Sequence, residues 1–234
     1  MNEFVLAATL LSVLGQSATA HVEQRVFRAP DGTRIPYGIS IPADYNANQP
    51  RPLVLALHPG AFQGQLYYGL RYLRSIFSPA LKDLGAIMVA PDCPARSWSE
   101  PAAEQAVEAL LHSVMDEYAI DRRRILVTGY SMGGRGTWYM ASRHSDLFTA
   151  AIPVAGSPGN EPIDRLGKIP MYVIHSRNDE VSPFAPDENM ALELAKLGRP
   201  VRFEALAGLG HFEMGGYIEA FTRAGHWVAE QWAK

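Results

Sequence analysis

Short apolar runs alternate with longer amphipathic stretches along most of this chain of 234 residues. The apolar runs are rich in β-branched residues and end in polar, glycine or proline residues, which is typical of strands in a parallel sheet. The amphipathic stretches have the length of helices that cross from one parallel strand to the next. The alternation therefore predicts an α/β fold, in which helices cover both faces of one mostly parallel sheet.

The positions of the expected elements follow from these runs. Strands are expected over residues 23–27, 34–41, 53–57, 86–90, 125–128, 151–154, 171–175 and 201–206. Helices are expected over residues 68–84, 101–118, 132–143, 186–197 and 216–233. A turn at Pro30-Asp31-Gly32 predicts that the first two strands form an antiparallel hairpin. Residues 156–170 leave little room for a helical lid, so we expect an open site at the carboxyl edge of the sheet.

Composition and charge argue against nucleic-acid binding, an internal disulfide bond and a metal site. The formal net charge of −3 provides no basic surface of the kind that nucleic-acid binding requires. Cys93 is the only cysteine, so an intramolecular disulfide bond is impossible. No cluster of histidine, cysteine and acidic residues has the spacing of a metal site, so we expect neither a metal nor an organic cofactor.

The first 20 residues have features of an export signal. The apolar run over residues 4–15 is short for a membrane span, and Ala18-Thr19-Ala20 places small residues where signal peptidase cleaves. Met1-Asn2-Glu3 lacks the usual Lys or Arg, so a retained N-terminal helix and a cytoplasmic location form the alternative. We expect a signal peptide over residues 1–20, a secreted or periplasmic protein, no stable membrane association after cleavage, and a single catalytic domain over residues 21–234.

The sequence Gly129-Tyr130-Ser131-Met132-Gly133 lies between an expected strand and an expected helix. A strand, sharp turn and helix push the central serine into strained backbone geometry above a sheet, where its hydroxyl is accessible. Gly129 and Gly133 are small because the turn brings the two backbones together. These features predict that Ser131 is the nucleophile of a serine hydrolase; the alternative is a serine that only caps the helix.

With this motif the chain resembles the α/β-hydrolase superfamily. The resemblance rests on Gly129-Tyr130-Ser131-Met132-Gly133-Gly134, on the early His58-Pro59-Gly60 and on the late Gly210-His211. Within the superfamily the chain resembles the lidless esterases grouped with feruloyl esterases, polyhydroxyalkanoate depolymerases and dienelactone hydrolases. The resemblance implies an α/β-hydrolase fold with a mostly parallel eight-stranded sheet, helices on both faces and no substantial lid.

The base that activates the serine should be a histidine on a loop late in the chain. His211 fits this position, because it follows the expected strand 201–206 in the glycine-containing loop Ala207-Gly208-Leu209-Gly210-His211. Three other histidines, His112, His144 and His226, lie on helical patterns and are discounted. His211 is therefore the expected general base.

An imidazole base needs a carboxylate on its other nitrogen. Asp179 follows the expected strand 171–175 in a loop that resembles the acid loop of the superfamily, so it is the expected orienting acid. Glu180 and Asp187 are the alternatives. Glu180 is adjacent and would point elsewhere, whereas the helix dipole explains a carboxylate such as Asp187 at the start of the next helix.

Two backbone N–H groups should stabilise the oxyanion that forms during attack. Met132, directly after the nucleophile, is expected to provide one of them. Ala61, in the loop that follows strand 53–57, is expected to provide the other, with Gly60 as the second choice. Pro59 stands where the superfamily more often has glycine, and proline has no N–H to donate. The alternative is a βα turn with no catalytic duty.

Aromatic residues near the catalytic edge form a candidate substrate wall. Phe62 and Trp98 are the expected substrate contacts, with Tyr67 and Tyr68 as weaker candidates, and core packing explains each nearly as well. The sequence thus predicts a serine carboxylic-ester hydrolase that acts on a small-molecule or polymer-derived ester. The alternatives are a serine exopeptidase or amidase of the prolyl-oligopeptidase-like type and a non-catalytic binding protein with the same fold.

Overall fold

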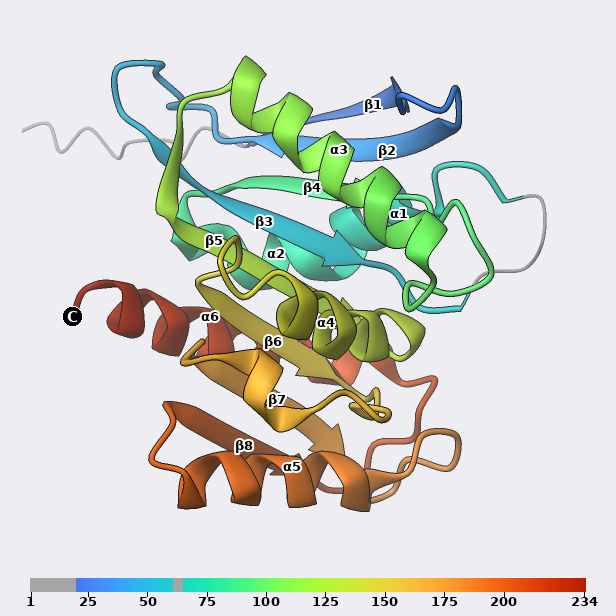
Figure 1. Cartoon of the computed structure of the whole chain (residues 1–234), viewed down its shortest axis with the longest axis vertical. Coiled ribbons are helices and arrows are strands. Elements are labelled where there is room, and N and C mark those ends of the chain that lie inside the picture. Colours follow the sequence, from blue (N-terminus) through green and yellow to red (C-terminus); the bar gives the residue numbers. More distant parts are fainter. Residues whose placement is uncertain (1–19, 61–64) are drawn as a thin grey trace, which may run out of the picture.

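The computed structural model describes residues 20–60 and 65–234, and it contains one eight-stranded sheet with the strand order β1-β2-β4-β3-β5-β6-β7-β8 (Figure 1). The strands are β1 His21–Arg28, β2 Arg34–Ile41, β3 Arg51–Leu57, β4 Ile87–Pro91, β5 Ile120–Tyr130, β6 Ala150–Val154, β7 Met171–Ser176 and β8 Val201–Leu206. β1 pairs antiparallel with β2 and β2 with β4, while the other five pairings are parallel. All eight expected strands and the opening hairpin are confirmed.

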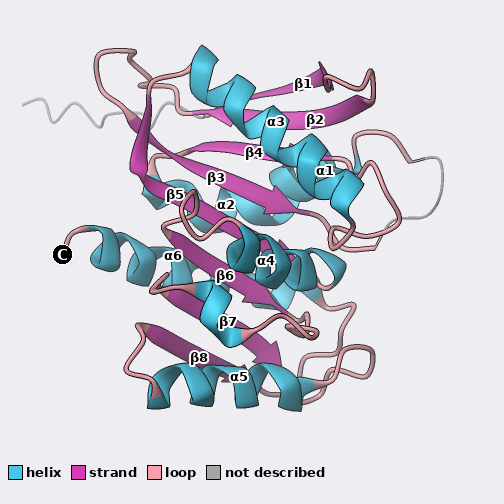
Figure 2. Ribbon diagram, viewed as in Figure 1, coloured by secondary structure: helices cyan, strands magenta, loops and turns pink. Residues whose placement is uncertain are grey.

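The helices also lie where the amphipathic stretches predicted them (Figure 2). They are α1 Tyr68–Tyr72, η1 Leu73–Phe77, α2 Ser78–Leu81, η2 Lys82–Leu84, α3 Pro101–Glu117, α4 Met132–Arg143, η3 Ile163–Leu166, α5 Phe184–Lys196, η4 Met214–Tyr217 and α6 Ile218–Trp232. Residues 68–84 differ from the expected single α-helix, because η1 is a π-helical turn and η2 a 3₁₀ turn. The π-helical turn comes just before Pro79, which has no N–H to bond and whose ring crowds the preceding turn.

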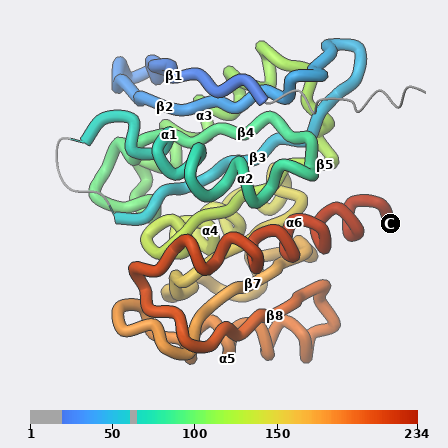
Figure 3. Tube along the Cα trace, turned by 180° about the vertical axis from the view of Figure 1, so that it is seen from behind, coloured from blue at the N-terminus to red at the C-terminus, as the bar shows by residue number. Residues whose placement is uncertain are grey.

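Two layers of helices enclose the sheet. Figure 1 shows α3, α4 and α5 in front of it, and Figure 3, from behind, shows α1, α2 and α6 on the opposite face. The side chains of β3 alternate between the two cores, since Leu53, Leu55 and Leu57 pack on the α3, α4 and α5 side while Val54 and Ala56 pack on the other. Burial on both faces explains why this strand is a continuous apolar run.

Glycines allow α4 to pack directly against the carboxyl ends of β3 and β6. A Cβ atom on Gly133 would overlap the carbonyl oxygen of Leu57, and one on Gly134 would overlap that of Val154. A Cβ atom on Gly136 would overlap the side chain of Trp98. The expectation that Gly133 is small because two backbones come together at the turn is confirmed, and the packing at Gly133 and Gly134 fixes the first turn of α4 beside the end of β5.

Between β6 and β7 the chain forms only the short η3, as expected for a fold without a helical lid in this connection. The carboxyl ends of β7 and β8 lead into loops, and that of β5 leads through Ser131 into α4. None of the helices in residues 20–60 and 65–234 has the length and apolar character needed to cross a membrane.

The packing of α4 predicts a strong effect of one added methyl group. Gly133→Ala should lower the free energy of unfolding by about 3 kcal/mol or more, because its methyl group would overlap backbone that cannot move independently. Gly215→Ala is the matched control, since a Cβ atom there meets nothing within 4 Å, and should change stability by less than about 0.5 kcal/mol. Equal effects in urea unfolding of the two variants would contradict this account of the packing.

Candidate active site

Ser131 occupies the turn between β5, which ends at Tyr130, and α4, which begins at Met132. Its backbone has φ 56° and ψ −115°, a conformation that a non-glycine residue adopts only under constraint. Such strain costs roughly 1–3 kcal/mol and persists where the surrounding structure imposes it. Here the Ser131 N–H donates to the Val154 carbonyl at 2.9 Å, which ties the turn to the neighbouring strand β6.

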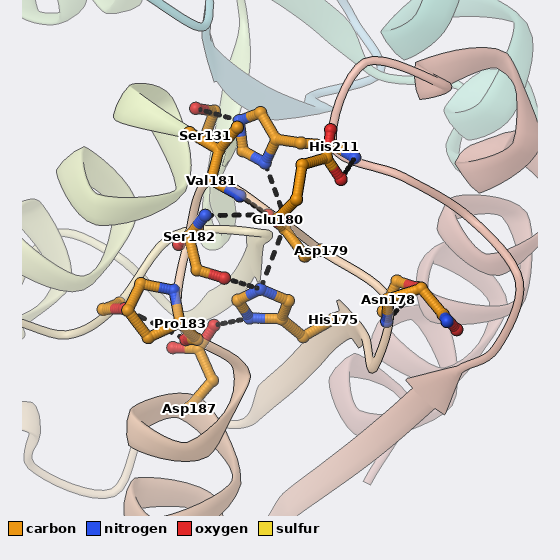
Figure 4. A network of polar contacts seen from close by, with 12 residues as sticks. Ser131, His175, Asn178, Asp179, Glu180, Val181, Ser182, Pro183, Asp187 and His211 are labelled. Carbon is orange, nitrogen blue, oxygen red and sulfur yellow. Dashed lines mark hydrogen bonds and ion pairs between the residues drawn. The ribbon is translucent and has the colours of Figure 1, made fainter.

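The structure brings Ser131, His211 and Asp179 together in one chain of hydrogen bonds (Figure 4). His211 Nε2 lies 2.7 Å from Ser131 Oγ, and His211 Nδ1 lies 2.7 Å from Asp179 Oδ2. An ionised carboxylate can only accept hydrogen bonds, so Nδ1 carries the proton and Nε2 is free to accept the serine hydroxyl. This is the tautomer that a general base requires.

The carboxylate of Asp179 is buried and held by the backbone of its own turn. Its Oδ1 accepts the N–H of Val181 at 2.9 Å and that of Ser182 at 2.7 Å. Burial alone would raise the pKa of the Asp179 carboxyl, but hydrogen bonds from His211 and these two N–H groups outweigh it and hold the pKa below its usual value. Asp179 is therefore ionised when His211 is neutral.

Two residues fix the backbone of the base from opposite sides. Tyr130 Oη donates to the His211 carbonyl at 2.7 Å, and the His211 N–H donates to Glu180 Oε2 at 3.0 Å. The sequence predicts no role for Tyr130, and Glu180 is expected only as an alternative orienting acid. Glu180 instead binds the main chain of His211, because its side chain and that of Asp179 leave the turn in different directions.

The helix dipole alone does not explain Asp187. Asp187 lies in the first turn of α5, but its side chain is fully buried and points into the protein. Its Oδ2 lies 2.6 Å from His175 Nδ1, and its Oδ1 accepts the indole N–H of Trp138 at 3.0 Å. Burial raises the pKa of the Asp187 carboxyl. Asp187 binds His175 and does not contact His211, so it is not placed to orient the base.

The structure describes some, but not all, of the backbone N–H groups that are expected to bind the oxyanion. Met132 is the first residue of α4, where the N–H has no acceptor within its own helix. Ala61 and Phe62, the expected second donor and substrate contact, lie outside the described residues. Gly60, the second choice, is exposed and its carbonyl accepts the hydroxyl of Tyr68 at 3.3 Å.

Trp98 is not a substrate contact. Its side chain is completely buried, and its indole N–H donates to the His58 carbonyl at 2.9 Å. Core packing, the alternative explanation, accounts for this residue, because a side chain without exposed surface cannot touch a ligand. Tyr68 is also buried and packs edge-on against His58.

The loop that leads to Gly60 begins with a buried, neutral histidine. The Cys93 N–H donates to His58 Nε2 at 3.0 Å, so the ring proton is on Nδ1, where it donates to the Pro59 carbonyl. Burial lowers the pKa of His58 to about 4. Burial also raises the pKa of the Cys93 thiol to about 11, which agrees with its having no part in the chemistry. Among the described residues, no group of three His, Cys, Asp or Glu side chains is placed to hold a metal ion.

The neutral state of His58 makes stability depend on pH. The folded pKa of about 4 lies below the unfolded value, so the unfolded chain takes up a proton first as the pH falls through about 6.5, and stability is lost down to about pH 4. Between pH 7 and pH 5 the wild type should therefore lose about 2 kcal/mol more than His58→Gln, as measured by urea unfolding. His226→Gln, at an exposed histidine, should follow the wild type, and identical pH dependence in His58→Gln would refute the explanation.

Comparison with solved structures supports the fold. The chain superimposes on a thermostable esterase with a TM-score of 0.74 and 29% identity, over 89% of this chain and 62% of the other. It superimposes on a ferulic acid esterase with a TM-score of 0.73 over 91% of this chain and 99% of the other, at 16% identity, which shows the fold alone. The α/β-hydrolase fold is therefore confirmed.

Sequence relatives include several enzymes named as feruloyl esterases. The probable feruloyl esterase C of Aspergillus niger is 28% identical in an alignment of 165 residues that covers 63% of this chain and 56% of that protein. Feruloyl esterase D of Neurospora crassa is 26% identical in an alignment of 199 residues that covers 76% of this chain and 64% of that protein. These matches span less than two thirds of the length of either relative. The model of the dienelactone hydrolase family matches residues 90–215, more than half of the chain, and so this protein belongs to the dienelactone hydrolase family.

Proposed function

We propose that the protein is a serine carboxylic-ester hydrolase that forms an acyl-enzyme on Ser131. The observation that carries this proposal is the unbroken series of hydrogen bonds from Ser131 Oγ through His211 to Asp179, at a turn with strained backbone. The family and the esterases among the relatives support the same class of reaction.

In the first half of the reaction, Ser131 Oγ attacks the ester carbonyl while His211 Nε2 takes the hydroxyl proton. The carboxylate of Asp179 stabilises the imidazolium that forms. His211 then gives this proton to the leaving alcohol, and the acyl group stays on Ser131. In the second half, His211 takes a proton from the water that attacks the acyl-enzyme, and it returns this proton to Ser131 Oγ as the bond between Oγ and the acyl group breaks and the acid leaves.

The Met132 N–H, at the start of α4, would bind the oxyanion together with the N–H of Ala61. One such donor is worth about 3 kcal/mol of transition-state stabilisation. The partial positive charge at the beginning of α4 adds to this effect, because negative charge is stabilised at the amino end of a helix.

The substrate class we propose is an ester of an aromatic or other apolar acid, free or attached to a polymer. Phe212 directly follows His211, is 79% exposed and places its ring 5.5 Å from the imidazole, where an acyl group could pack. Phe62 is proposed as a second apolar contact. A signal peptide over residues 1–20 and a secreted or periplasmic location are part of the same proposal.

The nucleophile can be tested by its removal. Wild-type protein should hydrolyse nitrophenyl esters and react with a fluorophosphonate probe, whereas Ser131→Ala should lose at least about 10³-fold in kcat and all labelling. Esters of graded chain length, compared with feruloyl, acetyl-sugar and aminoacyl substrates, would then define specificity. A wild-type protein that neither hydrolyses esters nor reacts with the probe would refute the proposed function.

The orienting acid is tested by a change that keeps its shape. Asp179→Asn should lower kcat by about 10⁴-fold, because a neutral amide cannot stabilise the imidazolium and favours the wrong tautomer of His211. Asp83→Asn, at an exposed carboxylate that pairs with His226, is the control and should leave kcat unchanged. If the kcat of Asp179→Asn is near that of the wild type, Asp179 is not the orienting acid, and Glu180 or Asp187 would have to be tested for this role.

A further inference from the structure

A second histidine–carboxylate pair lies behind Asp179, and the proposed mechanism does not use it. His175, near the end of β7, and Asp187, in the first turn of α5, have completely buried side chains. Their Nδ1 and Oδ2 atoms are 2.6 Å apart (Figure 4). Buried ionisable groups are costly unless they are paired, so a pair at this place calls for an explanation beyond core packing.

The free nitrogen of this histidine faces the catalytic acid. His175 Nε2 lies 3.2 Å from the Ser182 carbonyl oxygen and 3.3 Å from Asp179 Oδ2. Both neighbours are acceptors when Asp179 is ionised, so Nε2 must carry a proton. His175 therefore acts on Asp179 in two ways: it places an N–H beside Oδ2, and it holds the turn whose Ser182 N–H binds Oδ1.

The charges around this imidazole favour its cationic form. Burial alone would lower the pKa of His175, but the hydrogen bond that it donates to Asp187 and the negative charges of Asp187 and Asp179 outweigh burial and raise the pKa. When His175 is protonated on both nitrogens between two ionised carboxylates, the three groups carry one net negative charge. The positive charge favours the ionised form of Asp179, whose side chain is buried.

The pair of His175 and Asp187 also contacts α4, the helix that begins directly after the nucleophile. Asp187 Oδ1 accepts the indole N–H of Trp138, a buried residue of α4. Polar contacts connect six residues in sequence: Ser131, His211, Asp179, His175, Asp187 and Trp138. The backbone of α4 closes this path, because the helix carries Trp138 and begins at Met132, directly after Ser131. The acid is thus fixed relative to the nucleophile by side chains as well as by the backbone.

We propose that His175, held by Asp187, is a positioning residue that fixes the carboxylate of Asp179 in the orientation that His211 needs for catalysis. This inference rests on the proposed esterase function. Loss of the Nε2–H should therefore lower kcat and leave KM nearly unchanged, because His175 touches no substrate.

Two amide variants separate this role from a purely structural one. The amide nitrogen of glutamine can replace Nε2 and keep the donor toward Asp179 and Ser182, whereas asparagine reaches only the position of Nδ1, beside Asp187. His175→Asn should lower kcat toward nitrophenyl esters by about 10- to 100-fold with KM changed less than about twofold, the loss expected for a small displacement of a catalytic group. His175→Gln should restore kcat to within about fivefold of the wild type. His226→Asn and His226→Gln, at an exposed histidine, are the matched controls and should leave kcat unchanged.

Each result decides between the proposals. If the wild type is active and His175→Asn is as fast as the wild type, or His175→Gln is as slow as His175→Asn, the positioning role is refuted while the esterase function stands. An inactive wild type would overturn both. Should the asparagine variant fail to fold, nitrogen NMR of ¹⁵N-histidine in the wild type gives the answer, because Nε2 of His175 faces two acceptors and should be protonated at neutral pH; an unprotonated Nε2 would refute the proposal.

Discussion

The close approach of α4 to the ends of β3 and β6 is the constraint on which the site depends. Glycine at positions 133 and 134 lets the helix begin against the carbonyl groups of Leu57 and Val154, where any side chain would overlap backbone. The chain can leave β5 and enter α4 at that distance only through a sharp turn, and Ser131 occupies it with positive φ. The strain of the turn is therefore supported by packing over two neighbouring strands.

The hydrogen bonds around Asp179 and His211 depend on a different constraint, which is the burial of a charged carboxylate. Asp179 accepts N–H groups from His211, Val181 and Ser182, which together keep a buried carboxylate ionised. Tyr130 and Glu180 fix the backbone of His211 from two sides. The base and the acid thus reach their relative orientation before a substrate binds, and preorganised charge of this kind is a large part of catalysis by hydrolases.

The features that could be predicted are those that depend on residues close together in the sequence. Strands buried on both faces are continuous apolar runs, and the glycine pattern around Ser131 is a direct consequence of backbone contact, so both could be predicted. The environment of Asp187 could not, because its partners His175 and Trp138 are far away in the sequence and only the fold brings them together. The burial of Trp98 was missed for a similar reason: a loop aromatic has no periodicity that tells core from surface.

The central claim is that Ser131 is the acylated residue, and the direct measurement is the site of covalent modification. After reaction with a fluorophosphonate, trypsin would release residues 125–135, since Arg124 precedes and Arg135 ends this segment. Mass spectrometry should find the phosphonate on this peptide and fragmentation should place it on Ser131. An unmodified peptide 125–135, with the phosphonate on another residue or on none, would contradict the account.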